Sequence, residues 1–188
     1  QHLFPERNDQ RPMRLLVPLD GSRMAESVLP AVQLLARRLP LRVLLFHVIE
    51  QSPHASIHGQ LHLTEAAEAH RYLEATAKVI CGAAVQVETH VHCDMTGDVA
   101  GSIVEHADEL GADLIVMCTH GFSGVKGLLF GTIAQQALHH GRRSILLIPP
   151  RLAQQPPELK LKRVLLALDF MHNHDRALAE AALLAKSY

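Results

Sequence analysis

The stretch that decides the fold is Arg14-Leu-Leu-Val-Pro-Leu-Asp20, followed directly by Gly21-Ser22. A short apolar run that ends in a turn is typical of a buried β-strand. Ser22 is a preferred helix N-cap, and residues 23–39 place apolar side chains on one helical face. We therefore predict a strand, a tight turn and a single helix over residues 14–39.

The same alternation continues along the chain to Ile148. Further strands are expected at 42–49, 85–91, 113–117 and 144–148, and further helices at 63–81, 97–110 and 132–140. Gly111 and Gly141 are natural helix ends, and residues 50–62 are expected to form a loop. This order predicts an α/β, Rossmann-like fold: an open, mainly parallel five-stranded sheet, order 3-2-1-4-5, with helices on both faces.

Composition excludes several classes of function. The 188 residues carry 18 Lys+Arg against 19 Asp+Glu, and only 4% are aromatic, so neither a phosphate-backbone footprint nor base-stacking platforms are expected. The three cysteines form no C-x-x-C pair, which argues against a disulfide framework or a zinc ribbon. No apolar run approaches the roughly 20 residues that span a bilayer. We expect a cytoplasmic protein with no nucleic-acid partner and no membrane insertion.

A glycine-rich loop joins the expected strand 113–117 to the expected helix 132–140. It contains Gly121, Gly124, Gly127 and Gly131. Glycines let backbone N–H groups approach a ligand, and the following helix N-terminus favours an anion. Thr132 could both cap that helix and bind a phosphate oxygen or a phosphate-bound cation. The spacing matches neither the P-loop nor G-x-G-x-x-G. The pattern favours a phosphate site, and the alternative is a connector without a ligand.

The position of Asp20 supports this hypothesis. In the order 3-2-1-4-5, the strands that end at Asp20 and Met117 are neighbours at the switch point, where open α/β sheets bind ligands. A carboxylate beside a phosphate cradle suits a ribose hydroxyl. The alternative for Asp20 is that it is only a cap at the entry to the helix.

Residues 13–149 resemble the universal stress protein family, an adenine-nucleotide-binding α/β fold. The resemblance rests on Val-Pro-Leu-Asp-Gly-Ser at 17–22, His-Val at 47–48, the strand 113–117, the glycine loop, and Ser-Ile-Leu-Leu-Ile-Pro at 144–149. The nucleotide-binding branch has G-x-x-G, nine residues, then G-[ST]. Gly121, residues 122–130, Gly131 and Thr132 match the second part, whereas Cys118 stands in place of the first glycine.

The resemblance implies an ATP site, or one for a related adenine nucleotide, with Mg²⁺ or Mn²⁺ as an optional companion. Pro18 and Asp20 would line the ribose side, and the backbone of Val48 would pair with the adenine edge. Other residues would border the ribose and phosphates: Met117, His120 and Gly121. The phosphates themselves would be held by Gly131, Thr132 and Ile133. The family also dimerises through its last strand, here 144–148, so a homodimer is expected.

Two other functions stay open beside a stress-response or regulatory role. A dimerisation module that binds no nucleotide is the first, and the Cβ of Cys118 favours it. A slow ATP hydrolase is the second, although His120 is its one candidate base and no catalytic residue is assigned. His54, His58 and His62 recur at spacing four, but Pro53 and Gly59 interrupt a helix there, so a solvated loop and no metal site are expected.

The residues after 149 contain a partial repeat of the N-terminal sequence. A Pro- and Gln-rich linker is expected at 150–161. Beyond it, residues 163–188 align with 14–39 at a constant offset of 149, with eight identities in 26 positions. We predict that 162–188 is the first strand and helix of a second, incomplete copy. The strand 163–168 and helix 175–187 should pack on the first unit or on another chain.

Overall fold

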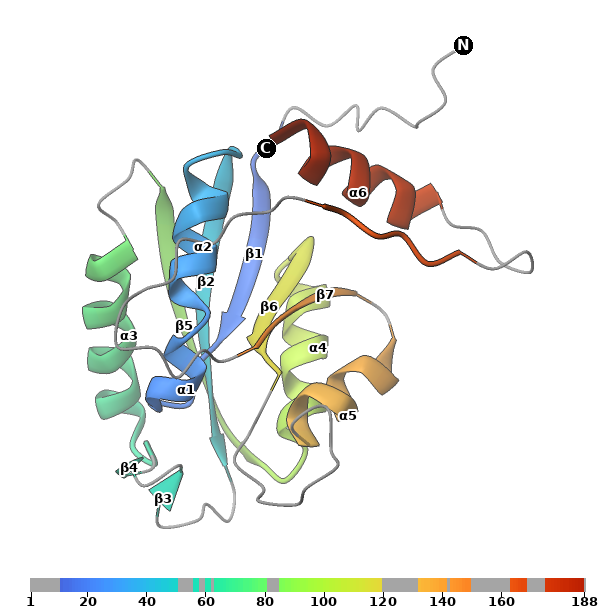
Figure 1. The fold of residues 1–188 in the computed structure, drawn as a ribbon. Coiled ribbons are helices and arrows are strands. Elements are labelled where there is room, and N and C mark those ends of the chain that lie inside the picture. The colour runs from blue at the N-terminus through green and yellow to red at the C-terminus, as the bar shows by residue number, and fades with distance from the viewer. Residues whose placement is uncertain are drawn as a thin grey trace.

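One parallel sheet organises the chain. The computed structural model describes residues 11–50, 56–57, 60–61, 63–80, 85–119, 132–141, 143–149, 163–168 and 175–187. The sheet has the order β5-β2-β1-β6-β7, which confirms the predicted order 3-2-1-4-5 (Figure 1). Its strands are β1 (Met13–Pro18), β2 (Leu41–Glu50), β5 (Gln86–Thr96), β6 (Leu114–Cys118) and β7 (Ser144–Ile148). The predicted loop 50–62 contains a small antiparallel pair, β3 (Ser56–Ile57) and β4 (Gln60–Leu61).

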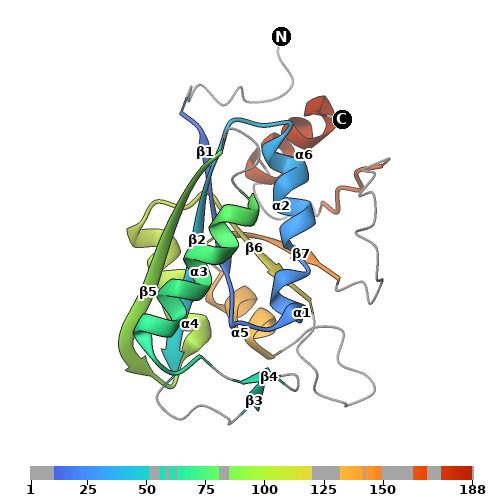
Figure 2. The same cartoon turned by 90° about the vertical axis from the view of Figure 1, so that its left-hand side faces the viewer.

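Helices cover both faces of the sheet. They are α1 (Arg23–Glu26), α2 (Leu29–Ala36), α3 (Ala66–Ile80), α4 (Val99–Glu109), α5 (Thr132–His140) and α6 (Asp175–Ser187). The first three lie on one face, while α4 and α5 lie on the other (Figures 1 and 2). No helix in the described ranges is both long and apolar enough to cross a bilayer.

The core is split by the sheet into two clusters. Alternate residues of β2 serve opposite faces: Val43 and Leu45 pack toward α2 and α3, whereas Leu44 and Phe46 pack toward α4. Leu45 and Phe46 are both 0% exposed. A strand buried on both faces reads as a continuous apolar run, which is why the pattern at 42–49 predicted it.

The single helix expected over 23–39 is wrong, because the chain forms α1 and α2 with a turn between them. Pro30 has no N–H, and its ring would clash with the carbonyl of residue 26 in a continuous helix. The chain therefore turns at Ser27 and Val28, and Pro30 occupies the first turn of α2. The predicted cap is confirmed, since Ser22 Oγ accepts a hydrogen bond from the Ala25 backbone N–H at 3.1 Å.

Two predicted helix ends are confirmed. Gly111 follows α4 and Gly141 follows α5, each with φ of +63°. Only glycine adopts this conformation without steric cost, so both act as stop signals. The two ends place the amino termini of β6 and β7 side by side.

α6 packs on the first unit at the amino end of the strands, away from β3 and β4 (Figures 1 and 2). Ser144 Oγ donates a hydrogen bond to Glu180 Oε1 at 2.7 Å, and Leu184 packs against the cluster on the α2 side. Residues 163–168 join neither sheet. The side chain of Leu165 is 96% exposed. The helix thus packs as expected, whereas the expected strand pairs with nothing in the described part of the chain.

Candidate functional site

The carboxyl ends of β1 and β6 turn toward different neighbours. The two strands pair only at Leu15–Leu114 and Leu16–Ile115. Beyond these pairs, the Leu19 N–H donates to the Phe46 carbonyl of β2 at 2.8 Å, while the Thr119 N–H donates to Ile148 of β7 at 3.0 Å. Divergence of two adjacent parallel strands marks the switch point of an open α/β sheet, where ligands bind.

Asp20 lies on the β1 side of this divergence. Its Oδ1 accepts a hydrogen bond from the Ser22 backbone N–H at 2.9 Å, forming a local turn that leads into α1. The helix cap itself is Ser22, so Asp20 shapes the entry to the helix without being its cap. One interaction does not exhaust a carboxylate, which can accept further hydrogen bonds from a ligand hydroxyl. Pro18, the last residue of β1, is half-buried and pairs with Phe46.

The turn at Gly21 is packed closely under the segment before α3. Gly21 has φ of +85°, and a Cβ at this position would lie 2.8 Å from Leu63 Cδ1. The positive φ favours glycine here, and a Cβ would also force the Leu63 side chain to shift. Leu63 is itself 8% exposed, so a buried side chain packs against the turn that carries Asp20 and fixes it.

Val48 lies on β2, two residues after Phe46, which is the last residue of β2 that pairs with β1. The Pro18–Phe46 pair ends the β1–β2 register, and Val48 pairs with His92 of β5 on the other side. Alternate residues of a strand direct their N–H and C=O groups to the same side. The Phe46 carbonyl accepts from Leu19, so the backbone groups of Val48 also face the β1 side. This is the geometry that pairing with the edge of a base requires.

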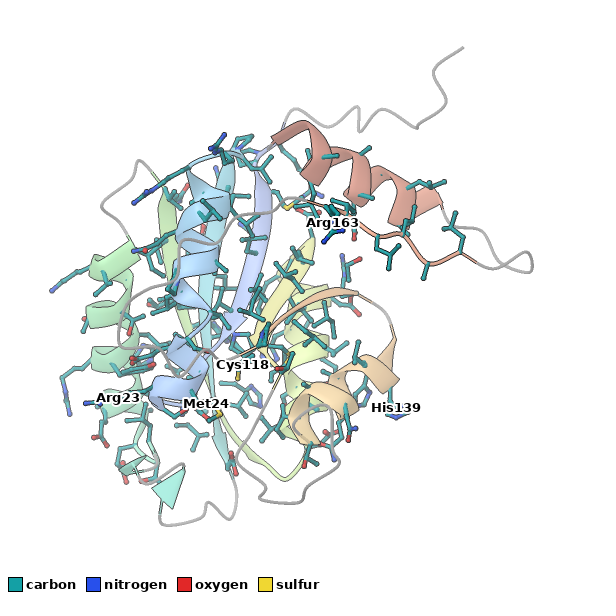
Figure 3. All side chains as sticks on the ribbon, viewed as in Figure 1. Arg23, Met24, Cys118, His139 and Arg163 are labelled. Carbon is teal, nitrogen blue, oxygen red and sulfur yellow. The ribbon has the colours of Figure 1, made fainter. Side chains whose placement is uncertain are left out.

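Met117 and Cys118 end β6 and point to opposite faces. Met117 is 7% exposed and packs in the cluster under α4, whereas Cys118 packs on the α1 side. Figure 3 shows Cys118 at the end of β6 toward α1, which carries Arg23 and Met24. The side chain that replaces the motif glycine is therefore directed to α1, on the same face as the Asp20 turn.

Thr132 and Ile133 are the first two residues of α5, and both side chains are exposed. Thr132 lies within the helix, in its first turn, where backbone N–H groups are still unpaired by the helix itself. His120, Gly121 and Gly131 lie outside the described residues, as does most of the glycine loop. The structure thus brings Pro18, Asp20, Val48 and Met117 to one edge of the sheet.

One residue of this edge was missed as a candidate. His47 is 2% exposed, with Nδ1 2.7 Å from the Leu19 carbonyl oxygen and Nε2 3.1 Å from that of Leu63. The signal was available, because a histidine interrupts the apolar run of β2. A titratable side chain inside a strand buried on both faces needs specific hydrogen-bond partners.

The α1 side of the site carries the carboxylates of Asp20 and Glu26 together with Arg23. Burial raises the pKa of the Tyr72 hydroxyl on α3 well above its usual range, with contributions from the carboxylates of Glu26 and Asp20.

Three histidines lie close together on the α4 face of the sheet. His90 and His92 of β5 share this face with His106 of α4, and ring centroids lie 5.4 Å apart for His90–His106 and 4.6 Å for His92–His106. Burial lowers the pKa of His90, and His106, His92 and His70 lower it further, while Glu109 acts in the opposite direction. Among the described residues, no three His, Cys, Asp or Glu side chains are arranged to hold a metal ion. His54, His58 and His62 lie outside them.

A family model described as "Universal stress protein family" matches residues 12–149. The chain belongs to the universal stress protein family. The matched residues contain β1 to β7 and the whole candidate site, whereas α6 lies outside the match.

Known members of the family are distant in sequence and share the fold. Universal stress protein MJ0531 of Methanocaldococcus jannaschii is 27% identical over 138 residues, which cover 72% of this chain and 81% of that protein. The Archaeoglobus fulgidus universal stress protein in complex with dAMP has a TM-score of 0.52 at 21% identity, covering 73% and 96% of the two chains. An Arabidopsis thaliana family protein with AMP bound has a TM-score of 0.55 at 17% identity, covering 77% and 98%.

Proposed function

We propose that this universal stress protein binds ATP, or a related adenine nucleotide, where β1 and β6 diverge. Occupancy of the site would regulate its assembly or its partners in a cytoplasmic stress response. The observation that carries the proposal is the opposite turning of Leu19 and Thr119, which leaves Asp20 and the Val48 backbone at the switch point. The adenine mononucleotides held by the Archaeoglobus fulgidus and Arabidopsis thaliana proteins support the same ligand class.

Each proposed contact follows from the chemistry of the group. The Asp20 carboxylate accepts from the ribose hydroxyls, Pro18 lines the ribose, and the Val48 backbone pairs with the adenine edge. The remaining contacts run along the ribose and phosphates to the start of α5, and come from Met117, His120, Gly121, Gly131, Thr132 and Ile133. Mg²⁺ or Mn²⁺ would accompany the phosphates as a ligand of the nucleotide.

The proposal is tested by titrating the full chain with ATP in a calorimeter, with and without Mg²⁺. We expect saturable binding that weakens about tenfold or more in Asp20→Asn, because a hydrogen bond to a charged group is worth about 1.5–3 kcal/mol. Asparagine keeps an oxygen for the Ser22 N–H, so the turn is retained while the charge is lost. Gly131→Val combined with Thr132→Ala should also weaken binding, and unchanged affinity in both variants would overturn the assigned site.

Asp113→Asn is the matched control. Asp113 Oδ2 accepts from the Arg14 backbone N–H at 2.9 Å, at the opposite end of the same strand pair. This substitution likewise keeps a backbone hydrogen bond and removes a carboxylate. Its ATP affinity should equal that of the wild type, and a similar loss in both variants would indicate a general effect of charge or stability.

Two outcomes of the titration favour other functions. No affinity for ATP, AMP or dAMP would favour a dimerisation module that binds no nucleotide. Turnover of ATP that disappears in His120→Ala would indicate a slow hydrolase.

We also propose that two copies associate through β7. This strand is at the edge of the sheet, and all five of its residues are only half-buried, four of them apolar. An apolar edge strand is a template for pairing with another chain. Sedimentation velocity of the full chain should give a dimer, and a monomer across the micromolar range would contradict this.

The residues after the family match are proposed to be a linker, 150–161, and the opening strand and helix of a second copy, 162–188. The alignment with 14–39 and the presence of α6 support this. Limited proteolysis of the full chain should cut first between 150 and 161. First cuts inside 13–149 would contradict this division.

A further inference from the structure

Leu63, in the segment between β4 and α3, packs directly on the turn that bears Asp20. A Cβ at Gly21 would lie 2.8, 3.0 and 3.7 Å from Leu63 Cδ1, Cγ and Cδ2, the three nearest heavy atoms beyond the chain neighbours of Gly21. Leu63 is buried in the same core cluster as Leu19, the residue before Asp20. This packing therefore joins the turn after β1 to a segment that is distant in the sequence.

The backbone of Leu63 is held close to the same turn. The ring of His47 lies between two carbonyl oxygens, with Nε2 3.1 Å from that of Leu63 and Nδ1 2.7 Å from that of Leu19. His47 belongs to β2, which lies between β5 and β1 in the sheet. The position of Leu63 relative to the turn is therefore set from the interior of the sheet.

The direction of the Asp20 carboxylate depends on the backbone at Gly21. Asp20 Oδ1 accepts a hydrogen bond from the Ser22 N–H at 2.9 Å, so this bond spans Gly21. A glycine has more accessible backbone conformations than any other residue, and Gly21 has no side chain that would limit them. Packing of Leu63 on Gly21 reduces this freedom, and the carboxylate keeps lone pairs for a ligand hydroxyl.

We infer that Leu63 is a positioning residue of the proposed nucleotide site, which acts through Asp20 by restricting the glycine turn that carries its carboxylate. This inference rests on the proposed function, since it concerns the same site. Leu63 touches no ligand in this account. It contributes to affinity because an acceptor that is already oriented loses less conformational freedom on binding. That contribution exists only for ligands whose ribose has hydroxyls to donate to Asp20.

Calorimetric titrations of the full chain with ATP and with 2′,3′-dideoxy-ATP test this role. Leu63→Ala should bind ATP about threefold to tenfold more weakly than the wild type, because part of a hydrogen bond to a charged group is lost. It should bind the dideoxy nucleotide with wild-type affinity, because that ligand has no ribose hydroxyl for Asp20. An equal loss for both ligands, or no loss for ATP, would overturn the inference.

Leu73→Ala is the matched control. Leu73 of α3 is 0% exposed and belongs to the same core cluster as Leu63, so the change removes the same atoms on the same face of the sheet. It should lower the urea midpoint at least as much as Leu63→Ala and leave the ATP affinity unchanged. Leu63→Met keeps most of the buried volume and should restore most of the ATP affinity. A comparable loss of ATP affinity in Leu73→Ala would show that affinity follows stability, against a positioning role.

Hydrogen–deuterium exchange without nucleotide separates this inference from the proposed function. Leu63→Ala should speed exchange in peptides that contain 18–22 more than Leu73→Ala does, and unchanged exchange there in a folded Leu63→Ala would overturn the inference. If the wild type binds no nucleotide, the proposed function fails, while the exchange result still decides whether Leu63 holds the turn. If Leu63→Ala does not fold, Leu63→Val carries the same comparisons, with smaller changes expected in the same direction.

Discussion

Two adjacent residues of β2, Phe46 and His47, show how differently the two faces of one sheet are built. On the α3 face, His47 is enclosed and each ring nitrogen meets a backbone carbonyl. On the α4 face, Phe46 is also buried, but it meets the rings of His90 at 5.7 Å and His106 at 4.9 Å between centroids. One face uses a histidine as a hydrogen-bond donor, and the other stacks histidines as rings.

The difference teaches that the surroundings of a histidine decide its role in a sheet. The ring of His47 lies within hydrogen-bonding distance of two backbone carbonyl oxygens and so joins β2 to two other segments. Burial lowers the pKa of His90, and repulsion from His106, His92 and His70 lowers it further.

The largest effect is expected where the α4 face is truncated at Phe46. Phe46→Ala removes a fully buried ring and should lower the free energy of unfolding by about 3–5 kcal/mol. Urea denaturation measures this loss. Phe46→Leu is the control and should cost about 1.5 kcal/mol or less, since it keeps most of the buried volume. Equal losses for the two variants would show that this face is not closely packed around the ring.

The next effect concerns the turn on the α3 face. Gly21→Ala should cost about 2–4 kcal/mol, because an alanine at φ +85° is strained and its Cβ would overlap Leu63. Gly111→Ala is matched in conformation, with φ of +63°, but nothing lies within 4 Å of its Cβ. It should cost about 1 kcal/mol by the same denaturation measurement. A Gly21→Ala loss no greater than that of Gly111→Ala would contradict the close packing of the Asp20 turn.

A smaller effect is expected at the start of α4, the helix that presents His106. Asp98 Oδ1 accepts from the Gly101 backbone N–H at 2.8 Å and caps this helix. Asp98→Ala should cost about 1 kcal/mol, whereas Asp98→Asn, which retains a capping oxygen, should cost a few tenths. Thermal unfolding compares the two, and an equal loss in both would mean that charge, not capping, stabilises this end.

The smallest effect is the pH response of the α4 face. The unfolded chain takes up a proton at His90 near pH 6.5, but the folded chain does so only at lower pH, because its pKa is lowered. Stability from this group is therefore present above pH 6.5 and is lost as the pH falls toward the folded pKa. Urea midpoints at about pH 7.5 and about pH 5.5 measure it. His90→Gln should reduce the loss, and an unchanged pH dependence would exclude His90 as its source.

The sheet was predictable because its signals are local and repeated. Apolar runs ending at Asp20 and Met117 alternate with helical patterns, and parallel connection rules then leave few strand orders. Gly111 and Gly141 gave the helix ends correctly, since a positive φ at a helix end strongly favours glycine. These features depend on single residues whose conformational limits are known.

Other features needed the folded chain. In residues 23–39 the apolar periodicity continues past Pro30, so it predicts one helix. Pro30 nevertheless divides this segment into α1 and α2. His47 has meaning only once Leu19 and Leu63, 28 and 16 residues away, supply its two acceptors. Residues 163–168 read as a strand from their apolar pattern, but a strand forms only where a partner edge is available.

Hydrogen–deuterium exchange of the full chain, with and without saturating ATP, tests the central claim most directly. Adenine nucleotide at the switch point should slow exchange in peptides that contain 18–22, 47–49 and 117–119, and should leave α6 unchanged. Asp113→Asn should give the same pattern, and Asp20→Asn a weaker one at the same ATP concentration. Protection confined to other segments, or no protection at all, would contradict binding where β1 and β6 diverge.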